Sequence, residues 1–316
     1  MTTDMTSEAI RLGLVGLGKI ARDQHLPAIE RTDGIELVAV ASPGANHPGV
    51  ANYQSVEAML AAEAELDAVV LCQPPQARFA AARQALLAGK HVFLEKPPGM
   101  TLSEVEALND IARSLGVTLF ASWHSRVGSA VEKVRIWLAD RTIEEIRIDW
   151  KEDVRVWHPG QEWIWQPGGF GVFDPGINAL SILTHIVAEA VHLKAAELFF
   201  PENLQAPIAA ILEMATISGA PVKADFDFLQ TSPQTWDISV RTSDGLVVLS
   251  EGGNTMSICG HDVKLEEQSE YRTLYRHFVE LVVRKKCDVD LAPLRLVADA
   301  FLCGSRRIVE PFYDET

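Results

Sequence analysis

The sequence predicts an α/β protein in which a doubly wound parallel sheet is followed by an α+β region with an open, mostly antiparallel sheet. Short apolar runs alternate with helical segments over residues 11–121, which is typical of parallel strands joined by crossover helices. A Gly-rich turn directly follows the first of these runs. From Leu198 onward, strand-like runs succeed one another without crossover helices, which indicates an antiparallel meander.

The length of 316 residues predicts two domains. The change of pattern after about residue 130 divides them into residues 1–127 and 128–316, and the last helix is a candidate to pack back on the first domain. The net charge of −15 would repel a phosphate backbone, so we expect no nucleic-acid partner. The first ten residues lack the features of a secretory signal, and no run is long and apolar enough to span a membrane. The four cysteines show no metal-ligand spacing; we expect free, mostly buried thiols, no metal and a cytoplasmic location.

In the first domain, the Thr101-x-x-Glu104 capping box starts a helix that runs to about Leu115. The other elements follow from apolar periodicity: strands at residues 11–15, 36–41, 67–72, 91–94 and 116–121, and helices at 55–64 and 77–88. In the second domain the same reading predicts strands at 143–156, 209–217, 221–228, 235–242 and 245–250, and helices at 130–139, 175–189, 271–283 and 293–306.

The Gly-rich turn has the pattern Gly16-x-Gly18-x-x-Ala21 between a strand and a helix. In this pattern the first Gly makes the tight turn, the second lets a pyrophosphate approach the backbone, and the small third residue lets the helix pack closely. We therefore expect a dinucleotide. The second strand is followed by Ser42 rather than by the acid typical of NAD sites or the Arg typical of NADP sites, so NAD is only slightly favoured and dual use is open.

A second motif, Glu95-Lys96-Pro97-Pro98, ends the buried strand at residues 91–94. Chemistry in doubly wound sheets collects beyond the carboxyl ends of the strands, which would place Lys96 near the Gly-rich turn. A surface Lys in a turn is the alternative.

Polar and aromatic residues gather at the start of the second domain. Four of the seven tryptophans, which include Trp150 and Trp157, lie within sixteen positions. They suit stacking on a sugar, or a core or interface cluster. Asp174 and Asn178 are four residues apart and share a helix face, although Asp174 also fits an N-cap.

These motifs together resemble the glucose–fructose oxidoreductase / inositol dehydrogenase / rhizopine catabolism (Gfo/Idh/MocA) family. The resemblance implies an N-terminal Rossmann domain, a C-terminal domain with an open sheet, NAD(P)-dependent oxidoreduction of sugars or polyols, and an active site between the domains. Residues 18–25, 123–126, 174–179 and 297–301 are similar to the bacterial aldose 1-dehydrogenases of this family, which act on L-arabinose or D-galactose. Much of the wider family has His where this chain has Asn178.

The resemblance and the motifs together name the expected site residues. Catalysis is expected from Lys96, Asp174 and Asn178. The nucleotide is expected to contact Gly16, Gly18, Lys19, Ile20, Ser42, Gln73, Pro74, Glu95 and Lys96. The sugar is expected to contact His124, Glu152, Trp157, His158, Asp174, Asn178 and Trp236. Either Asp174 or Lys96 is expected to act as the base, as a coupled pair.

The resulting expectation is an NAD(P)-dependent aldose 1-dehydrogenase that oxidises C1 of D-galactose, L-arabinose or both to the lactone. No Lys/Arg cluster surrounds the expected sugar residues, which favours a free sugar over a phosphorylated one. A polyol, inositol or dihydrodiol dehydrogenase is the alternative enzyme, and a non-catalytic sugar or redox sensor is the alternative from another class. We expect a homo-oligomer, dimer or tetramer, formed through the C-terminal sheet.

Overall fold

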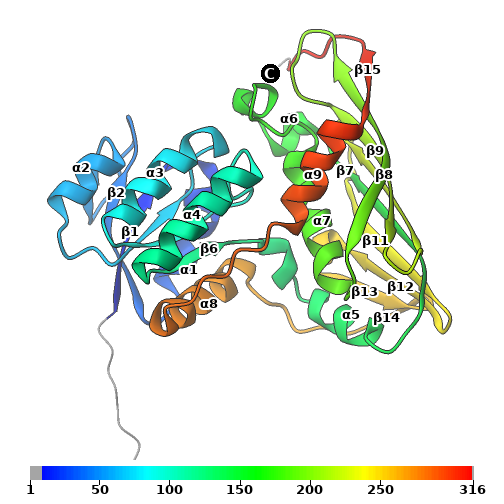
Figure 1. The fold of residues 1–316 in the computed structure, drawn as a ribbon, viewed down its shortest axis with the longest axis horizontal. Helices are drawn as coiled ribbons and strands as arrows, with labels where there is room; N and C mark the ends of the chain where they lie inside the picture. The colour runs from blue at the N-terminus through cyan, green and yellow to red at the C-terminus, as the bar shows by residue number, and fades with distance from the viewer. Residues whose placement is uncertain (1–8, 315–316) are drawn as a thin grey trace, which may run out of the picture. The chain divides into compact units, whose positions relative to one another are not determined.

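The computed structural model describes residues 9–314, and these residues form two compact units. Unit 1 combines the described residues up to Ser122 with Ser269–Asp290, and unit 2 combines Trp123–Gln268 with the described residues from Leu291 onward. Figure 1 shows the labelled elements of both units.

Unit 1 is built on a six-stranded parallel sheet with the order β3-β2-β1-β4-β5-β6. Its strands are β1 (Ile10–Val15), β2 (Ile35–Ala41), β3 (Ala51–Tyr53), β4 (Ala68–Leu71), β5 (His91–Leu94) and β6 (Leu119–Ala121). Every residue of β4 is buried, because a parallel sheet is covered on both faces and its central strands are apolar throughout. The predicted doubly wound sheet is confirmed, and the three-residue strand β3 is an element that the sequence prediction lacked.

The helices of unit 1 are η1 (Ala21–His25), which has π-helical bonding, α1 (Leu26–Glu30), α2 (Val56–Ala62), α3 (Pro75–Leu87), α4 (Leu102–Leu115) and α8 (Glu270–Arg284). The capping box at Thr101 forms as predicted, and Gly116 ends α4 in the left-handed conformation. Helix α3 packs against α2 and α4, while α1 packs against α8. Aromatic rings of α8 lie on Phe93 of β5 and Phe120 of β6, which explains why this helix belongs to unit 1.

Unit 2 is built on a nine-stranded sheet with the order β14-β13-β12-β11-β7-β10-β9-β8-β15. Its strands are β7 (Ile143–Lys151), β8 (Val191–Pro201), β9 (Ala209–Thr216), β10 (Pro221–Asp227), β11 (Thr235–Thr242), β12 (Gly245–Ser250), β13 (Thr255–Ile258), β14 (His261–Asp262) and β15 (Ser305–Val309). Most pairs are antiparallel, as predicted, but the expected single meander is wrong. Strand β7 inserts between β10 and β11, parallel to β10, because its apolar face completes the middle of the core.

The helices of unit 2 are η2 (His124–Val127), α5 (Val131–Leu138), α6 (Val154–Trp157), η3 (Glu162–Trp165), α7 (Phe173–Ile186), η4 (Glu251–Gly253) and α9 (Ala292–Cys303). Helix α7 is buried along most of its length and packs against α5, α9 and β7. Figure 1 shows α5, α7 and α9 on one face of the large sheet. The core of unit 2 therefore lies between these helices and the sheet.

Four local predictions for unit 2 and the cysteines are corrected. The strand predicted to reach residue 156 ends at Lys151, because Asp153 caps α6 by accepting the Arg155 N–H. The helix predicted over 175–189 is α7, and its N-cap is Val172, so Asp174 lies inside the first turn and is not the N-cap. The helix predicted to reach residue 306 ends at Cys303, since the chain then joins the sheet as β15 beside β8. Cys259 and Cys303 are exposed and only Cys72 of the four is buried, so the prediction that the thiols are mostly buried is wrong.

Candidate active site

The Gly-rich turn connects β1 to η1 at the carboxyl end of the parallel sheet. Gly16 has a φ of +90°, and a Cβ there would lie 2.9 Å from the main-chain nitrogen of Gln73. Gly18 differs, because a Cβ at this position would meet nothing within 4 Å. Gly16 is thus required by the fold itself, whereas Gly18 leaves open space beside the backbone, as a bound phosphate requires.

The surroundings of this turn fit a dinucleotide. The first N–H groups of a helix lack intrahelical acceptors and favour an anion, and Lys19 and Ile20 stand at this helix start. Ser42 is buried at the end of β2, where its hydroxyl accepts the Leu17 N–H at 3.2 Å. Ser42 therefore braces the turn and keeps its own hydroxyl proton available to a ribose or phosphate oxygen.

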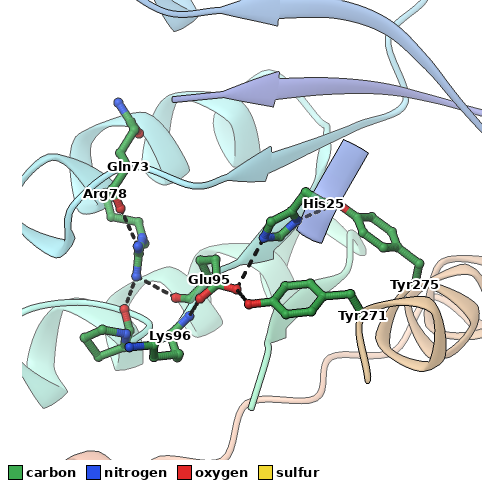
Figure 2. A network of polar contacts seen from close by, with 8 residues as sticks. His25, Gln73, Arg78, Glu95, Lys96, Tyr271 and Tyr275 are labelled. Carbon is green, nitrogen blue, oxygen red and sulfur yellow. Dashed lines mark hydrogen bonds and ion pairs between the residues drawn. The ribbon is translucent and has the colours of Figure 1, made fainter. Parts of the chain in front are cut away.

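The segments that follow β4 and β5 are joined by a buried guanidinium. Arg78 of α3 donates to the main-chain carbonyls of Gln73, Glu95 and Pro97, and the bond to Glu95 measures 2.5 Å. Figure 2 shows this side chain between the two segments, with Lys96 at one end. Arg78 is 2% exposed, so it holds both segments at the same sheet edge without itself facing solvent.

The Glu95 carboxylate lies inside unit 1 within a network of buried polar groups (Figure 2). Its Oε2 accepts the Lys96 N–H at 2.5 Å, and its Oε1 accepts the Tyr271 hydroxyl of α8 at 2.7 Å. His25 continues the network, with Nε2 3.3 Å from Glu95 Oε1 and Nδ1 2.8 Å from the Tyr275 hydroxyl. The network thus joins η1, the end of β5 and α8.

Both phenols in this network stay neutral over the physiological range. Burial raises the pKa of Tyr271 well above its usual range, and the neighbouring Glu95 raises the pKa further. Burial likewise raises the pKa of Tyr275. A neutral phenol can donate a hydrogen bond to a carboxylate, so the Tyr271–Glu95 bond persists across that range.

Unit 2 brings together four of the predicted sugar-binding residues. Glu152 follows β7 and is 2% exposed; its Oε1 lies 2.9 Å from His158 Nε2, and its Oε2 accepts the Trp236 indole N–H at 2.8 Å. His158 Nδ1 lies 3.6 Å from Asp174 Oδ2. Two buried carboxylates therefore flank one imidazole, and Trp236 of β11 orients the first of them.

Aromatic rings border the Glu152–His158–Asp174–Trp236 cluster. The Trp236 ring lies 4.7 Å from the Trp157 ring and is stacked on Trp150 at 6.2 Å. Trp150 is buried in the core, whereas Trp157 is 40% exposed. The sequence predicts tryptophans that either stack on a sugar or pack in a core or interface. Trp150 packs in the core, whereas Trp157 has an exposed face that could stack on a sugar.

Asp174 is held in the first turn of α7, where it is 3% exposed. Gly176 allows this helix to approach β10 closely, because a Cβ there would lie 3.2 Å from the Phe226 ring. Asn178 stands one turn later on the same face and is half-buried. Helix α7 thus carries both predicted catalytic residues of unit 2 at one end.

His124 lies in η2, which packs against α7, and its Nδ1 is 3.4 Å from the Ser125 hydroxyl. Arg126 of the same turn donates to the Ser181 carbonyl at 2.9 Å and to the Thr184 hydroxyl at 3.0 Å. Arg155 pairs with Asp153. The two arginines near the cluster in sequence are thus engaged within the fold.

Sequence reasoning missed three residues of the unit 1 network as functional candidates: His25, Arg78 and Tyr271. His25 stands at the end of the 18–25 stretch that carried the resemblance, which was a usable signal. Arg78 and Tyr271 gave none, because a charged residue in an Ala-rich helix and a Tyr in an amphipathic helix are both read as ordinary surface or core positions. Among residues 9–314, no cluster of His, Cys, Asp and Glu is arranged to hold a metal ion, and no helix is long and apolar enough to cross a membrane.

Comparison with known proteins covers nearly all of the chain. Residues 10–122 match the model of an oxidoreductase family with an NAD-binding Rossmann fold, GFO_IDH_MocA. Galactose 1-dehydrogenase of Pseudomonas fluorescens is 48% identical over 307 residues, which are 97% of this chain and all of that protein.

Solved structures are similar over the same length. D-galactose-1-dehydrogenase from Rhizobium etli superimposes with a TM-score of 0.93 at 55% identity, over 97% of this chain and 98% of that one. A 3-ketoreductase from Actinomadura kijaniata, solved in complex with NADP, superimposes with a TM-score of 0.84 at 19% identity, over 96% of this chain and all of that one. The second likeness supports the fold alone.

Proposed function

We propose, on the premise that this chain belongs to the GFO_IDH_MocA oxidoreductase family with its NAD-binding Rossmann fold, that it oxidises a free aldose at the anomeric carbon. The full-length likeness to galactose 1-dehydrogenases supports D-galactose as substrate and the lactone as product. L-Arabinose lacks only the C6 hydroxymethyl group and is the second sugar to test.

The cluster in unit 2 is the observation that carries the proposal. Carboxylates, an imidazole and an open indole face suit a neutral polyhydroxyl ligand, because each can accept from, donate to or stack on a sugar. Phosphorylated sugars call for bidentate Arg contacts, and Arg126 and Arg155 are engaged elsewhere in the fold. These contacts support a free sugar.

For the nucleotide, the open space at Gly18 and the helix start at Lys19 and Ile20 support pyrophosphate binding. Gly16, Gln73, Pro74 and Glu95 belong to the adjoining segments. The Ser42 hydroxyl suits hydrogen bonding to either ribose. The proposed nucleotide is therefore NAD or NADP, with NAD slightly favoured and dual use open. When bound there, the nucleotide would supply the acceptor for the hydride that leaves C1.

The residues of the chain handle the proton of the C1 hydroxyl. In our proposal Asp174 accepts this proton, and Lys96 hydrogen-bonds the same oxygen and stabilises the negative charge that develops on it. Asn178, Glu152, His158, His124, Trp157 and Trp236 bind and orient the sugar. The alternative assignment exchanges these two roles, so that Lys96 accepts the proton and Asp174 is its partner.

The direct test is to mix the purified protein with D-galactose or L-arabinose and either nucleotide, and to follow the absorbance of reduced nicotinamide. We expect turnover with a lactone product that hydrolyses to the aldonic acid. A ketone product from inositol would indicate the polyol alternative. Absence of turnover across an aldose panel with both nucleotides would refute the proposal and favour a sensor.

Substitution tests the two acid–base groups. We expect Lys96→Ala and Asp174→Asn each to lower kcat by about 100-fold or more, because each removes a group that acts on the reacting oxygen. Asp149→Asn is the control, since Asp149 pairs with Arg147 on β7. Calorimetric titration should show nearly unchanged nucleotide affinity for Asp174→Asn. Near-normal turnover of either variant would remove that residue from the mechanism.

A further inference from the structure

We propose that Tyr271 is a positioning residue for Lys96 and that it acts through the buried carboxylate of Glu95. The inference deepens the proposed function and rests on its assignment of Lys96 to the C1 hydroxyl. It assigns a role in the reaction to a residue of helix α8, since Tyr271 lies 175 positions beyond Lys96 in the chain.

The main chain at Lys96 is held from two sides. Its own N–H donates to Glu95 Oε2 at 2.5 Å. The carbonyls of Glu95 and Pro97, on either side of it, accept from Arg78. The direction in which the Lys96 side chain leaves the sheet edge therefore depends on where the Glu95 carboxylate is fixed (Figure 2).

The carboxylate is fixed in turn by its second oxygen. Oε1 accepts the Tyr271 hydroxyl at 2.7 Å, while His25 Nε2 stands at the longer distance of 3.3 Å. The Glu95 side chain is 3% exposed, so water cannot replace a lost partner at low cost. Without the Tyr271 hydroxyl, the carboxylate can rotate toward His25 and withdraw Oε2 from the Lys96 N–H.

Tyr275 provides a matched control one turn along the same helix. Both tyrosines are buried and packed on aromatic neighbours, Tyr271 on His25 and Tyr275 on Phe93. The Tyr275 hydroxyl, however, contacts His25 Nδ1 at 2.8 Å, one residue further from Glu95. Removing either hydroxyl costs a buried hydrogen bond, but Tyr271→Phe removes a direct bond to the carboxylate and Tyr275→Phe removes a bond to His25.

The kinetic test compares Tyr271→Phe with Tyr275→Phe. We expect Tyr271→Phe to lower kcat about tenfold, with the KM for the nucleotide within about twofold of the wild type, because displacement of a catalytic group affects the chemical step first. Tyr275→Phe should change kcat less than about twofold while lowering the Tm to a similar extent. Equal kcat values for the two variants would overturn the proposal.

A double-mutant cycle isolates the route of the effect. If Tyr271 acts through Lys96, adding Tyr271→Phe to Lys96→Ala should change single-turnover rates less than about twofold. An undiminished tenfold loss in the Lys96→Ala background would show that Tyr271 has a general structural role and would overturn the inference.

Hydrogen–deuterium exchange gives a readout that does not need activity. Peptides that contain the Lys96 amide should exchange about tenfold faster in Tyr271→Phe than in Tyr275→Phe. If the wild type shows no aldose turnover but this difference is present, the proposed function fails and the positioning contact stands. If the wild type turns over galactose and the difference is absent, the positioning inference fails alone.

Discussion

At the scale of single residues, the two buried carboxylates of unit 2 share His158 as a neighbour. Both oxygens of Glu152 have short polar contacts, to His158 and to the Trp236 N–H. Asp174 lies 3.6 Å from His158 Nδ1, which is longer than a hydrogen bond. Glu152 is therefore suited to hold a ligand group in a fixed position.

His91 of β5 contributes to the stability of unit 1 in a way that depends on pH. Burial lowers the pKa of His91 below its ordinary value of 6.5, against an opposing effect of Asp67 and with a smaller contribution from Lys285. The neutral ring is needed because Nδ1 accepts the Thr118 N–H at 2.9 Å. As pH falls below about 6.5, the unfolded chain binds a proton that the folded chain resists, so stability decreases with falling pH.

We expect the free energy of unfolding of the wild type to fall between about pH 7 and about pH 5, and this fall to be smaller in His91→Asn, which keeps an acceptor for Thr118. Urea denaturation at several pH values measures the difference. His192→Asn, at an exposed position of unit 2, should leave the pH profile unchanged. An identical profile for His91→Asn and the wild type would contradict the assignment.

At the scale of elements, the turn between β1 and η1 separates a requirement of the fold from a requirement of the ligand. Gly16 is constrained by its φ of +90° and by the Gln73 main chain, whereas Gly18 has neither constraint. An added side chain should therefore lower stability at Gly16 and nucleotide affinity at Gly18.

We expect Gly18→Val to lower nucleotide affinity by about 100-fold or more with little change in Tm, because its side chain enters the space meant for the pyrophosphate. Gly16→Ala should instead destabilise unit 1 by about 1–3 kcal/mol, through backbone strain and contact with Gln73. Calorimetric titration with NAD and thermal denaturation distinguish the two effects. Unchanged nucleotide affinity in Gly18→Val would refute the binding site.

Local signals identified most elements, and the failures in strand pairing share one cause. The Thr101 capping box, Gly116 and the apolar run of β5 determine structure through neighbours in sequence. Strand β7 lies between β10 and β11, and β15 pairs with β8, because of contacts between segments far apart in the chain. No periodicity within a segment encodes the partner that it will meet.

At the scale of the whole molecule, charged side chains lie on the outer face of the large sheet along β7 and β10. Along β7, buried Ile146, Ile148 and Trp150 alternate with Arg147, Asp149 and Lys151. Arg147 pairs with Asp149, and Lys151 pairs with Asp225 of β10. A homo-oligomer formed through this face would depend on charge as well as on apolar contact.

We expect a dimer or tetramer in solution, and we expect the double variant Arg147→Glu with Lys151→Glu to shift it toward monomer, because the acidic neighbours Asp149 and Asp225 would then face added negative charge. Sedimentation velocity over a range of concentrations and salt measures the change. A wild type that stays monomeric throughout, or a variant that assembles normally, would refute this interface.

The sequence by itself determined the parallel sheet with its Gly-rich turn, the position of Lys96 after β5, and the face of α7 shared by Asp174 and Asn178. These features depend on side-chain periodicity and on turn chemistry, which act over a few residues. The tertiary structure alone decided that Trp236 would orient Glu152, that Arg78 would clamp two sheet-edge segments, and that Tyr271 would reach Glu95. Such contacts join residues 5 to 176 positions apart, and they form only because burial removes water as the competing partner.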